Sequence, residues 1–65
     1  MISVTRLNGK PFVLNAELIR IVEANPDTTI TLTGGERVLV KESPREVVEK
    51  AVEYGRRLRS LLPPT

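Results

Sequence analysis

The sequence predicts an α+β fold, in which about five short antiparallel strands form a meander-like sheet or a small barrel and one C-terminal helix follows. Two observations predict it. Short segments of alternating apolar and polar residues are separated by turn signals, and one helix-start signal occurs near residue 43. Because 65 residues support only one core, we expect a single domain over residues 1–62, with residues 63–65 as a frayed C-terminal tail.

The first two strands form a hairpin around Asn8-Gly9. This dipeptide favours a two-residue type I′ turn, because both residues tolerate a positive φ. The flanking strands are Ile2 to Leu7 and Lys10 to Leu14, and the turn fixes their register. The predicted opposite pairs are Leu7–Lys10, Thr5–Phe12, Val4–Val13 and Ser3–Leu14. In this register both faces of the hairpin carry large apolar side chains.

The third strand is predicted from about Ile19 to Ala24, although this segment fits two patterns. The apolar residues at positions 18, 21 and 22 have helical spacing, whereas Ile19 and Ile21 alternate with Arg20 and Val22. We favour the strand because few residues separate the neighbouring turns and the next strand needs a partner.

The last two strands form a second hairpin after a turn at Asn25-Pro26-Asp27. Threonines alternate with apolar residues from Thr28 to Thr33, and Gly34-Gly35 then leads into Glu36 to Lys41. A two-residue turn at the glycines predicts Ile30 opposite Leu39 and Thr31 opposite Val38.

A long helix begins after Ser43. Ser43, Pro44 and Glu46 form a capping-box sequence with proline at the first helical position. Glu46–Lys50 and Glu53–Arg57 have the spacing of i,i+4 ion pairs, and Tyr54 is expected to pack at a flank or an interface. The stripe expected to lie on the sheet consists of Val47, Val48, Ala51, Val52, Gly55, Leu58 and Leu62.

The composition excludes several classes of site. The chain has no histidine and no cysteine, so disulfides, Cys/His zinc sites, thiol nucleophiles and imidazole catalysis are ruled out. The three acidic residues Glu17, Glu23 and Asp27 fit no metal-loop spacing. Strands rather than helices follow the glycine turns, which argues against a phosphate loop. We therefore expect no enzymatic activity and no cofactor.

Charge and hydropathy bear on the partners and on the expected location of the chain. Ten basic and eight acidic residues leave a net charge of +2, which is too small to indicate a nucleic-acid or membrane binder. The N-terminus lacks the basic-then-apolar pattern of a signal peptide, and no apolar run approaches the roughly 20 residues of a membrane span. We expect a cytoplasmic protein with no membrane span.

The basic residues of the helix are the candidate binding site. Arg56, Arg57 and Arg59 follow one another near its C-terminus, where arginine also complements the helix dipole without any ligand. Both interpretations stay open at this point. For a binding role, the candidate partner-binding residues are Arg45, Lys50, Arg56, Arg57 and Arg59.

Apolar residues on both sides of the first hairpin point to self-association. One helix covers only one face of a sheet, so the second face must be buried in a closed barrel-like core or against another molecule. We expect a homo-oligomer, because free strand edges and a second apolar face can join subunits.

Several sequence blocks resemble the flagellar FlbD family, also called swarming motility protein SwrD. The resemblance extends over about residues 1–60. It rests on the blocks at residues 1–10, 12–19, 23–28 and 30–35, among them Thr5-Arg6-Leu7-Asn8-Gly9 and Glu23-Ala24-Asn25-Pro26-Asp27-Thr28, and on Val40 to Ser43 before the helix.

The resemblance implies a small cytoplasmic bacterial protein that supports flagellar motor power and swarming. It brings no enzymatic activity, cofactor, catalytic residue or molecular partner, although the motor's stator or its cytoplasmic surroundings are the natural candidates for a partner. The alternative function is a small nucleic-acid-binding regulator that uses the basic C-terminal helix. We regard nucleic acid as the less favoured partner, because no aromatic stacking platform accompanies the arginines.

Overall fold

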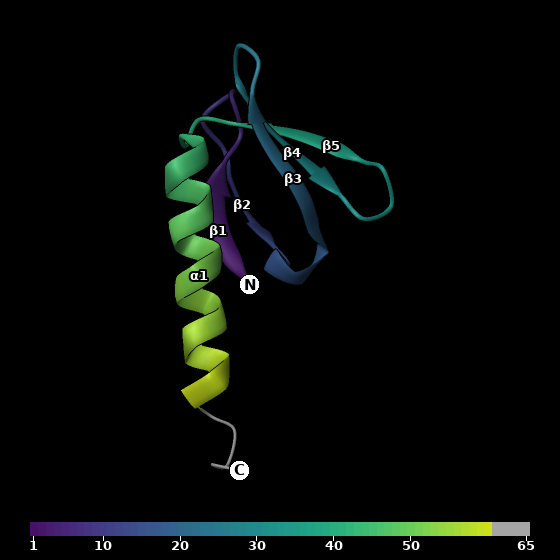
Figure 1. Ribbon diagram of the computed structural model, residues 1–65. Helices are drawn as coiled ribbons and strands as arrows, with labels where there is room; N and C mark the ends of the chain where they lie inside the picture. The colour runs from purple at the N-terminus through teal and green to yellow at the C-terminus, as the bar shows by residue number, and fades with distance from the viewer. Residues whose placement is uncertain (61–65) are drawn as a thin grey trace.

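The computed structural model describes residues 1–60, with side chains as far as residue 58, and its architecture is α+β (Figure 1). The predicted C-terminal tail (residues 63–65) and Leu62 lie outside the described residues, so the predicted domain boundary stays a prediction. In chain order the elements are β1 (Ile2–Thr5), β2 (Pro11–Leu14), the 3-10 helix η1 (Ala16–Leu18), β3 (Ile19–Ala24), β4 (Thr28–Leu32), β5 (Arg37–Val40) and α1 (Pro44–Ser60).

The strands form two sheets rather than a closed barrel. β1 pairs with β2, and β3, β4 and β5 form a three-stranded sheet in that order, all antiparallel. The two sheets meet at one corner, where Arg6 bridges Val40 and the Lys41 N–H donates to the Thr5 carbonyl at 2.8 Å. Five antiparallel strands and a C-terminal helix are thus confirmed, whereas the small-barrel alternative is wrong because the sheets join only at this corner.

The first hairpin turns through three residues, not two. The Arg6 carbonyl accepts from the Gly9 N–H at 2.9 Å, and the Arg6 N–H donates to the Lys10 carbonyl at the same distance. Gly9 alone has a positive φ, of 91°, while Asn8 keeps a negative φ and its Oδ1 accepts from the Lys10 N–H. This is a type I turn with a glycine bulge, so the predicted two-residue type I′ turn is wrong.

The longer turn shifts the register by one residue. Ile2 now lies opposite Leu14 and Val4 opposite Phe12, so these four apolar side chains share one face of the hairpin. Ser3, Thr5, Pro11 and Val13 occupy the other face. The predicted pairs are wrong, because a slip of one residue in one strand exchanges its two faces relative to the other strand. Val13 still places one large apolar side chain on the second face, where it is exposed.

The second hairpin repeats the same turn and the same correction. The Gly35 N–H donates to the Leu32 carbonyl at 2.9 Å, the Leu32 N–H donates to the Glu36 carbonyl at 2.8 Å, and Gly35 has a φ of 93°. Ile30 therefore lies opposite Val38, not Leu39. The inner face of this hairpin gathers the buried residues Thr28, Ile30 and Val40.

β3 is a strand as predicted, and an irregularity in its pairing explains its ambiguous pattern. Its register with β4 shifts between Ile19 and Ile21. After the shift Val22 pairs with the buried Ile30, while Ile19 pairs with Leu32 at the edge of the core. Ile19 and Val22 can thus both contribute to the core. In a regular strand, side chains three positions apart point to opposite faces.

α1 begins with the predicted capping box. The Ser43 Oγ accepts from the Glu46 N–H at 3.2 Å, and the Glu46 carboxylate accepts from the Ser43 N–H at 3.4 Å. Because that carboxylate turns back to Ser43, it forms no ion pair with Lys50, whereas the predicted pair of Glu53 and Arg57 is present at 3.5 Å.

The helix buries a narrower stripe than its sequence predicts. Val47 is fully buried, and Ala51, Tyr54 and Gly55 are half-buried. Val48, Val52 and Leu58, which were expected to lie on the sheet, are 50%, 45% and 38% exposed. The short strands cover one side of α1 only, so the other apolar flank remains in solvent.

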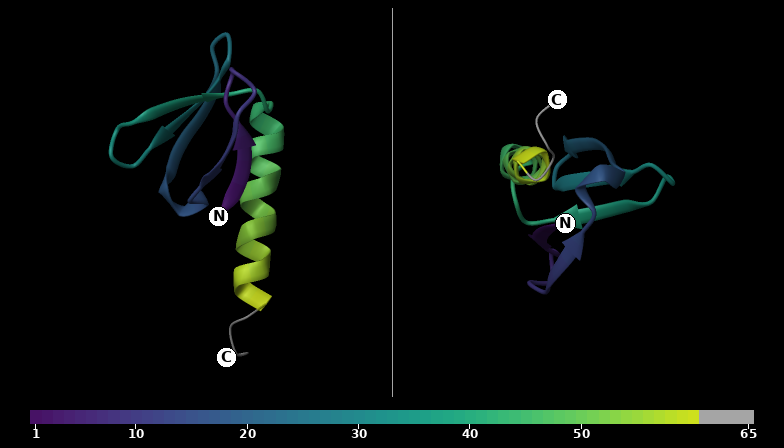
Figure 2. Two further views of the ribbon diagram at one scale, coloured as in Figure 1. Left: turned by 180° about the vertical axis from the view of Figure 1, so that it is seen from behind. Right: turned by 90° about the horizontal axis from the view of Figure 1, so that it is seen from below.

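The core lies between the two sheets and α1. It consists of Ile2, Val4, Leu14, Ile30, Val40 and Val47, and Phe12 and Tyr54 are among the half-buried residues packed against it. Seen from two further sides, the β4–β5 hairpin extends away from α1 (Figure 2). Within residues 1–60, no helix is long and apolar enough to cross a membrane.

Candidate partner-binding surface

The predicted binding residues lie on α1, and the structure divides them between two flanks. Arg45, Lys50, Arg56 and Arg57 are all exposed. Arg59 belongs to the helix, but its side chain lies outside the described part of the chain.

Lys50 and Arg57 belong to one flank. Seven residues separate them, which is about two helical turns, so they project from the same side of α1. Both line an open cleft of about 630 Å³ between α1 and the start of β1, which we call the N-terminal cleft. Its other lining residues are Met1, Ile2, Ser3, Glu46, Glu49, Glu53 and Tyr54.

The N-terminal cleft is a charged surface of mixed sign. Three carboxylates and two cations line its α1 side, and the Glu53–Arg57 pair is largely solvated, with 54% and 79% of the side chains exposed. An exposed pair of this kind contributes under about 1 kcal/mol to stability. No group of three or more acidic side chains among the described residues is placed to hold a metal ion. The cleft therefore suits contact with charged groups of a protein better than enclosure of a small molecule.

Arg45 and Arg56 belong to the other flank. Eleven residues, about three turns, separate them, and Val48 and Val52 lie between them one turn from either arginine. We call Val48 and Val52 the valine face of α1. The four basic residues of α1 whose side chains the structure describes thus do not form the continuous basic surface that nucleic-acid binding uses.

Sequence reasoning missed Glu42, which fixes α1 against β1. The two carboxylate oxygens of Glu42 accept from the Thr5 N–H at 2.8 Å and from the Thr5 Oγ1 hydroxyl at 2.9 Å. Burial alone would raise the pKa of Glu42, but the hydrogen bonds from Thr5 and from its own backbone amide, helped by the nearby Lys50 ammonium, lower the pKa below its usual 4.5. Thirty-seven residues separate the partners, so no local pattern could indicate the contact.

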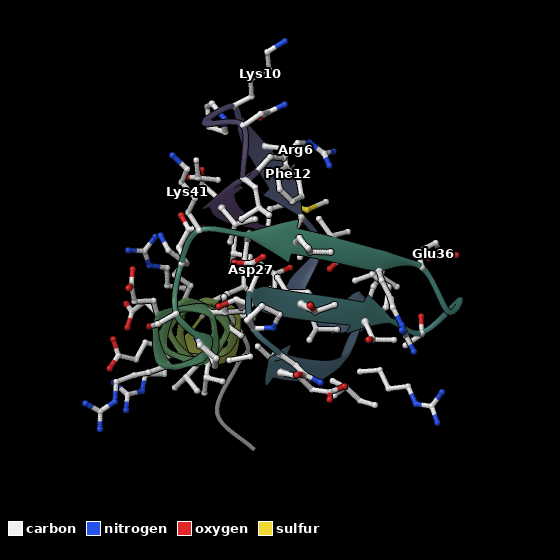
Figure 3. All side chains as sticks on the ribbon, turned by 90° about the horizontal axis from the view of Figure 1, so that it is seen from above. Arg6, Lys10, Phe12, Asp27, Glu36 and Lys41 are labelled. Atoms are coloured by element: carbon white, nitrogen blue, oxygen red, sulfur yellow. The ribbon has the colours of Figure 1, made fainter. Side chains whose placement is uncertain are left out.

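The first hairpin carries a second unpredicted contact at its far end. The Arg6 guanidinium lies over the Phe12 ring, 4.2 Å from the ring centroid, and Figure 3 shows both beside the exposed tip that bears Lys10. This contact shields the half-buried ring of Phe12. Lys10, at the same tip, is a cation remote from the C-terminal half of α1.

A protein-family model matches nearly the whole chain. The model of a family described as flagellar and swarming motility proteins, FlbD, matches residues 1–59. The match includes every strand and the whole helical segment from Arg45 to Arg59. No curated protein and no solved structure matches the chain.

Proposed function

We propose that this chain, which belongs to the FlbD family of flagellar and swarming motility proteins, acts in the cytoplasm as a non-enzymatic protein that supports flagellar motor torque and swarming. The observation that carries the proposal is the family match over residues 1–59, because it includes the strands, the core and the candidate surface together. The proposed mode of action is protein–protein contact, and the protein is proposed to work as a homo-oligomer.

The proposed contact surface is the exposed side of α1. Arg45, Lys50, Arg56, Arg57 and Arg59 would present cations to acidic groups on a motor or stator-associated protein. The geometry supports this in two ways. The side chains of the four described residues are exposed, so a partner can reach them, and Arg57 would exchange its solvated contact with Glu53 for a contact with the partner. Arginine also presents a planar donor fork that can bind a carboxylate through two hydrogen bonds.

A charge-reversal experiment in living cells tests this function. A strain of the source bacterium that lacks the protein would be complemented with the wild-type chain or with Arg56→Glu/Arg57→Glu. We expect the double variant to lower swarming expansion and the rotation speed of tethered, heavily loaded flagella toward the level of the deletion strain. The reason is that reversed charges repel an acidic partner.

A matched control reverses the same number of charges elsewhere. Lys10→Glu/Lys41→Glu changes two exposed lysines away from the C-terminal half of α1 (Figure 3) and should leave torque unchanged. Normal torque in Arg56→Glu/Arg57→Glu would contradict the assigned surface. Normal torque in the deletion strain itself would contradict the proposed function.

A further inference from the structure

The three-stranded sheet buries only one of its two faces. Its register places Val22, Ile30 and Val38 in one row on the core face. The residues that alternate with them form what we call the outer face, namely Ile21, Glu23, Thr29, Thr31, Arg37 and Leu39. Ile21 and Leu39 are 41% and 42% exposed there, as large apolar side chains with no layer above them.

The outer face has two opposite charges that form no ion pair with each other. Glu23 pairs across the sheet with Thr29 and then Leu39, whereas Ile21 pairs with Thr31 and then Arg37. Glu23 and Arg37 therefore occupy diagonal corners, about 12 Å apart at ordinary strand spacing. Within residues 1–60, neither has an ion-pair partner. Both line a hollow of about 280 Å³ together with Asn25, Thr29 and Thr31.

We propose that the outer face binds a second copy of this chain about a two-fold axis, with Glu23 of each copy paired to Arg37 of the other. This inference rests on the homo-oligomeric state in the proposed function and names its interface. A face-to-face two-fold axis that exchanges the Glu23 and Arg37 corners must run along the perpendicular bisector of the line between them, which passes close to Ile21 and Leu39. Each of these apolar residues then meets its own counterpart.

The same axis gives a recognised packing geometry. With strands about 4.8 Å apart and residues rising about 3.3 Å, that axis lies roughly 35° from the strand direction, so the strands of the two sheets cross at about 70°. This is close to the orthogonal class of sheet packing. The Arg37 side chain of one copy would enter the hollow of the other copy beside Glu23.

The polar residues at the centre of the outer face are compatible with burial. The Thr29 hydroxyl already donates to the Asp27 carbonyl at 3.2 Å, so covering it leaves no hydrogen-bond donor unsatisfied. The Thr31 hydroxyl would lie near its counterpart in the second copy, where two threonines can hydrogen-bond to each other. The interface therefore has a charged pair at two corners, apolar contacts at the other two, and threonines between them.

Three short strands make a small interface, so association should be weak. The outer face measures about 15 Å in each direction. Its area is therefore well below the roughly 800 Å² per partner of a standard interface. We expect a dissociation constant on the order of 0.1 mM. Sedimentation equilibrium between about 10 μM and 1 mM should show the wild-type mass rising from monomer to dimer.

Charge reversal and mixing locate the interface. Glu23→Arg alone and Arg37→Glu alone should each weaken association by at least about tenfold, because each places two pairs of like charges together. An equimolar mixture of the two variants should associate again, since each pair in the mixed dimer then joins opposite charges. Lys10→Glu is the matched control and should associate like the wild type.

Several results would overturn this inference. A wild-type chain that stays monomeric at about 1 mM would do so, as would a dimer that survives both reversals. Loss of the dimer in Val52→Asp but not in Glu23→Arg would place the interface on the valine face instead. Circular dichroism of every variant shows whether the fold is retained. These variants leave α1 intact. If the wild type stayed monomeric while Arg56→Glu/Arg57→Glu lowered torque as expected, the result would contradict the dimer alone.

Discussion

Glu42 connects two segments that are far apart in the sequence. Both of its carboxylate oxygens accept hydrogen bonds from Thr5, beside the corner where Arg6 bridges Val40. One side chain thus ties the end of β1 to the segment that leads into α1. The ionised form is the one that these donors favour, which is why the pKa of Glu42 is lowered.

Replacing Glu42 with glutamine should cost about 1 kcal/mol of unfolding free energy at pH 7, since a neutral amide accepts weaker hydrogen bonds and this site is only partly shielded from water. Urea unfolding of both proteins measures the difference. Ser3→Ala, at an exposed position on the same strand, serves as the control and should change stability by less than about 0.5 kcal/mol.

The pH dependence has a definite sign. The folded pKa of Glu42 lies below the usual 4.5, so the unfolded chain binds the proton more readily. Its contribution is therefore complete above pH 4.5 and is lost as the pH falls through the folded pKa. The stability gap between wild type and Glu42→Gln should close over that range. A gap that is constant from pH 7 to pH 3 would rule out ionised Glu42 as the cause.

At the scale of elements, the two hairpins share one design. Each turns through three residues, and the last of these is a glycine with a φ near 90°. Nothing in the structure lies within 4 Å of a Cβ built on Gly9 or Gly35, so only the backbone conformation demands glycine there. The shared turn gives both hairpins the pairing that collects their apolar residues on one face.

Gly35→Ala should therefore destabilise the fold by about 1 kcal/mol, because alanine is strained at this φ even though its side chain has room. Gly35→Asn is the matched variant and should cost clearly less, since asparagine tolerates the left-handed region. Thermal unfolding followed by circular dichroism compares the two. Equal losses in both variants would show that the backbone conformation is not the cause.

The hairpins also show where sequence reasoning succeeds and where it fails. The strand positions, the capping box at Ser43 and the helix follow from local signals, and the structure confirms them. The register does not follow, because Asn-Gly and Gly-Gly permit either a two-residue or a three-residue turn. The choice is made by burial: only the three-residue turns place Val4 beside Phe12, and Ile30 beside Val38, on the core side.

The candidate surface was only partly predictable for a related reason. The basic residues of α1 and their exposure can be inferred from sequence, but their division between the N-terminal cleft and the valine face depends on which side of the helix is buried. The sequence stripe included Val48 and Val52, but the structure leaves these two in solvent. Glu42 and the corner charges Glu23 and Arg37 acquire their roles only through contacts or register.

At the scale of the whole molecule, stability depends on a small aliphatic core. Six buried residues come from β1, β2, β4, β5 and α1, and none of them is aromatic. A domain of this size has a total stability of only about 3–10 kcal/mol. A single cavity in the core is therefore a large fraction of the whole.

Ile30→Ala should leave a substantial fraction of the protein unfolded at 37 °C. Ile30 is completely buried at the centre of the three-stranded sheet, and such a truncation costs about 2–5 kcal/mol. Val13→Ala, at a position that is 67% exposed, should change stability by no more than about 0.5 kcal/mol. Denaturant titration of both variants measures the contrast, and comparable losses would mean that Ile30 is not central to the core.

The corner formed by Thr5, Arg6, Val40 and Glu42 has a consequence for synthesis on the ribosome. The N-terminal hairpin emerges first, but the residues that cover its apolar face follow some forty positions later. Until then Val4 and Phe12 are exposed to solvent and to other molecules of the cell. The β1–β2 hairpin is thus synthesised before the other elements but is among the last to complete its packing contacts.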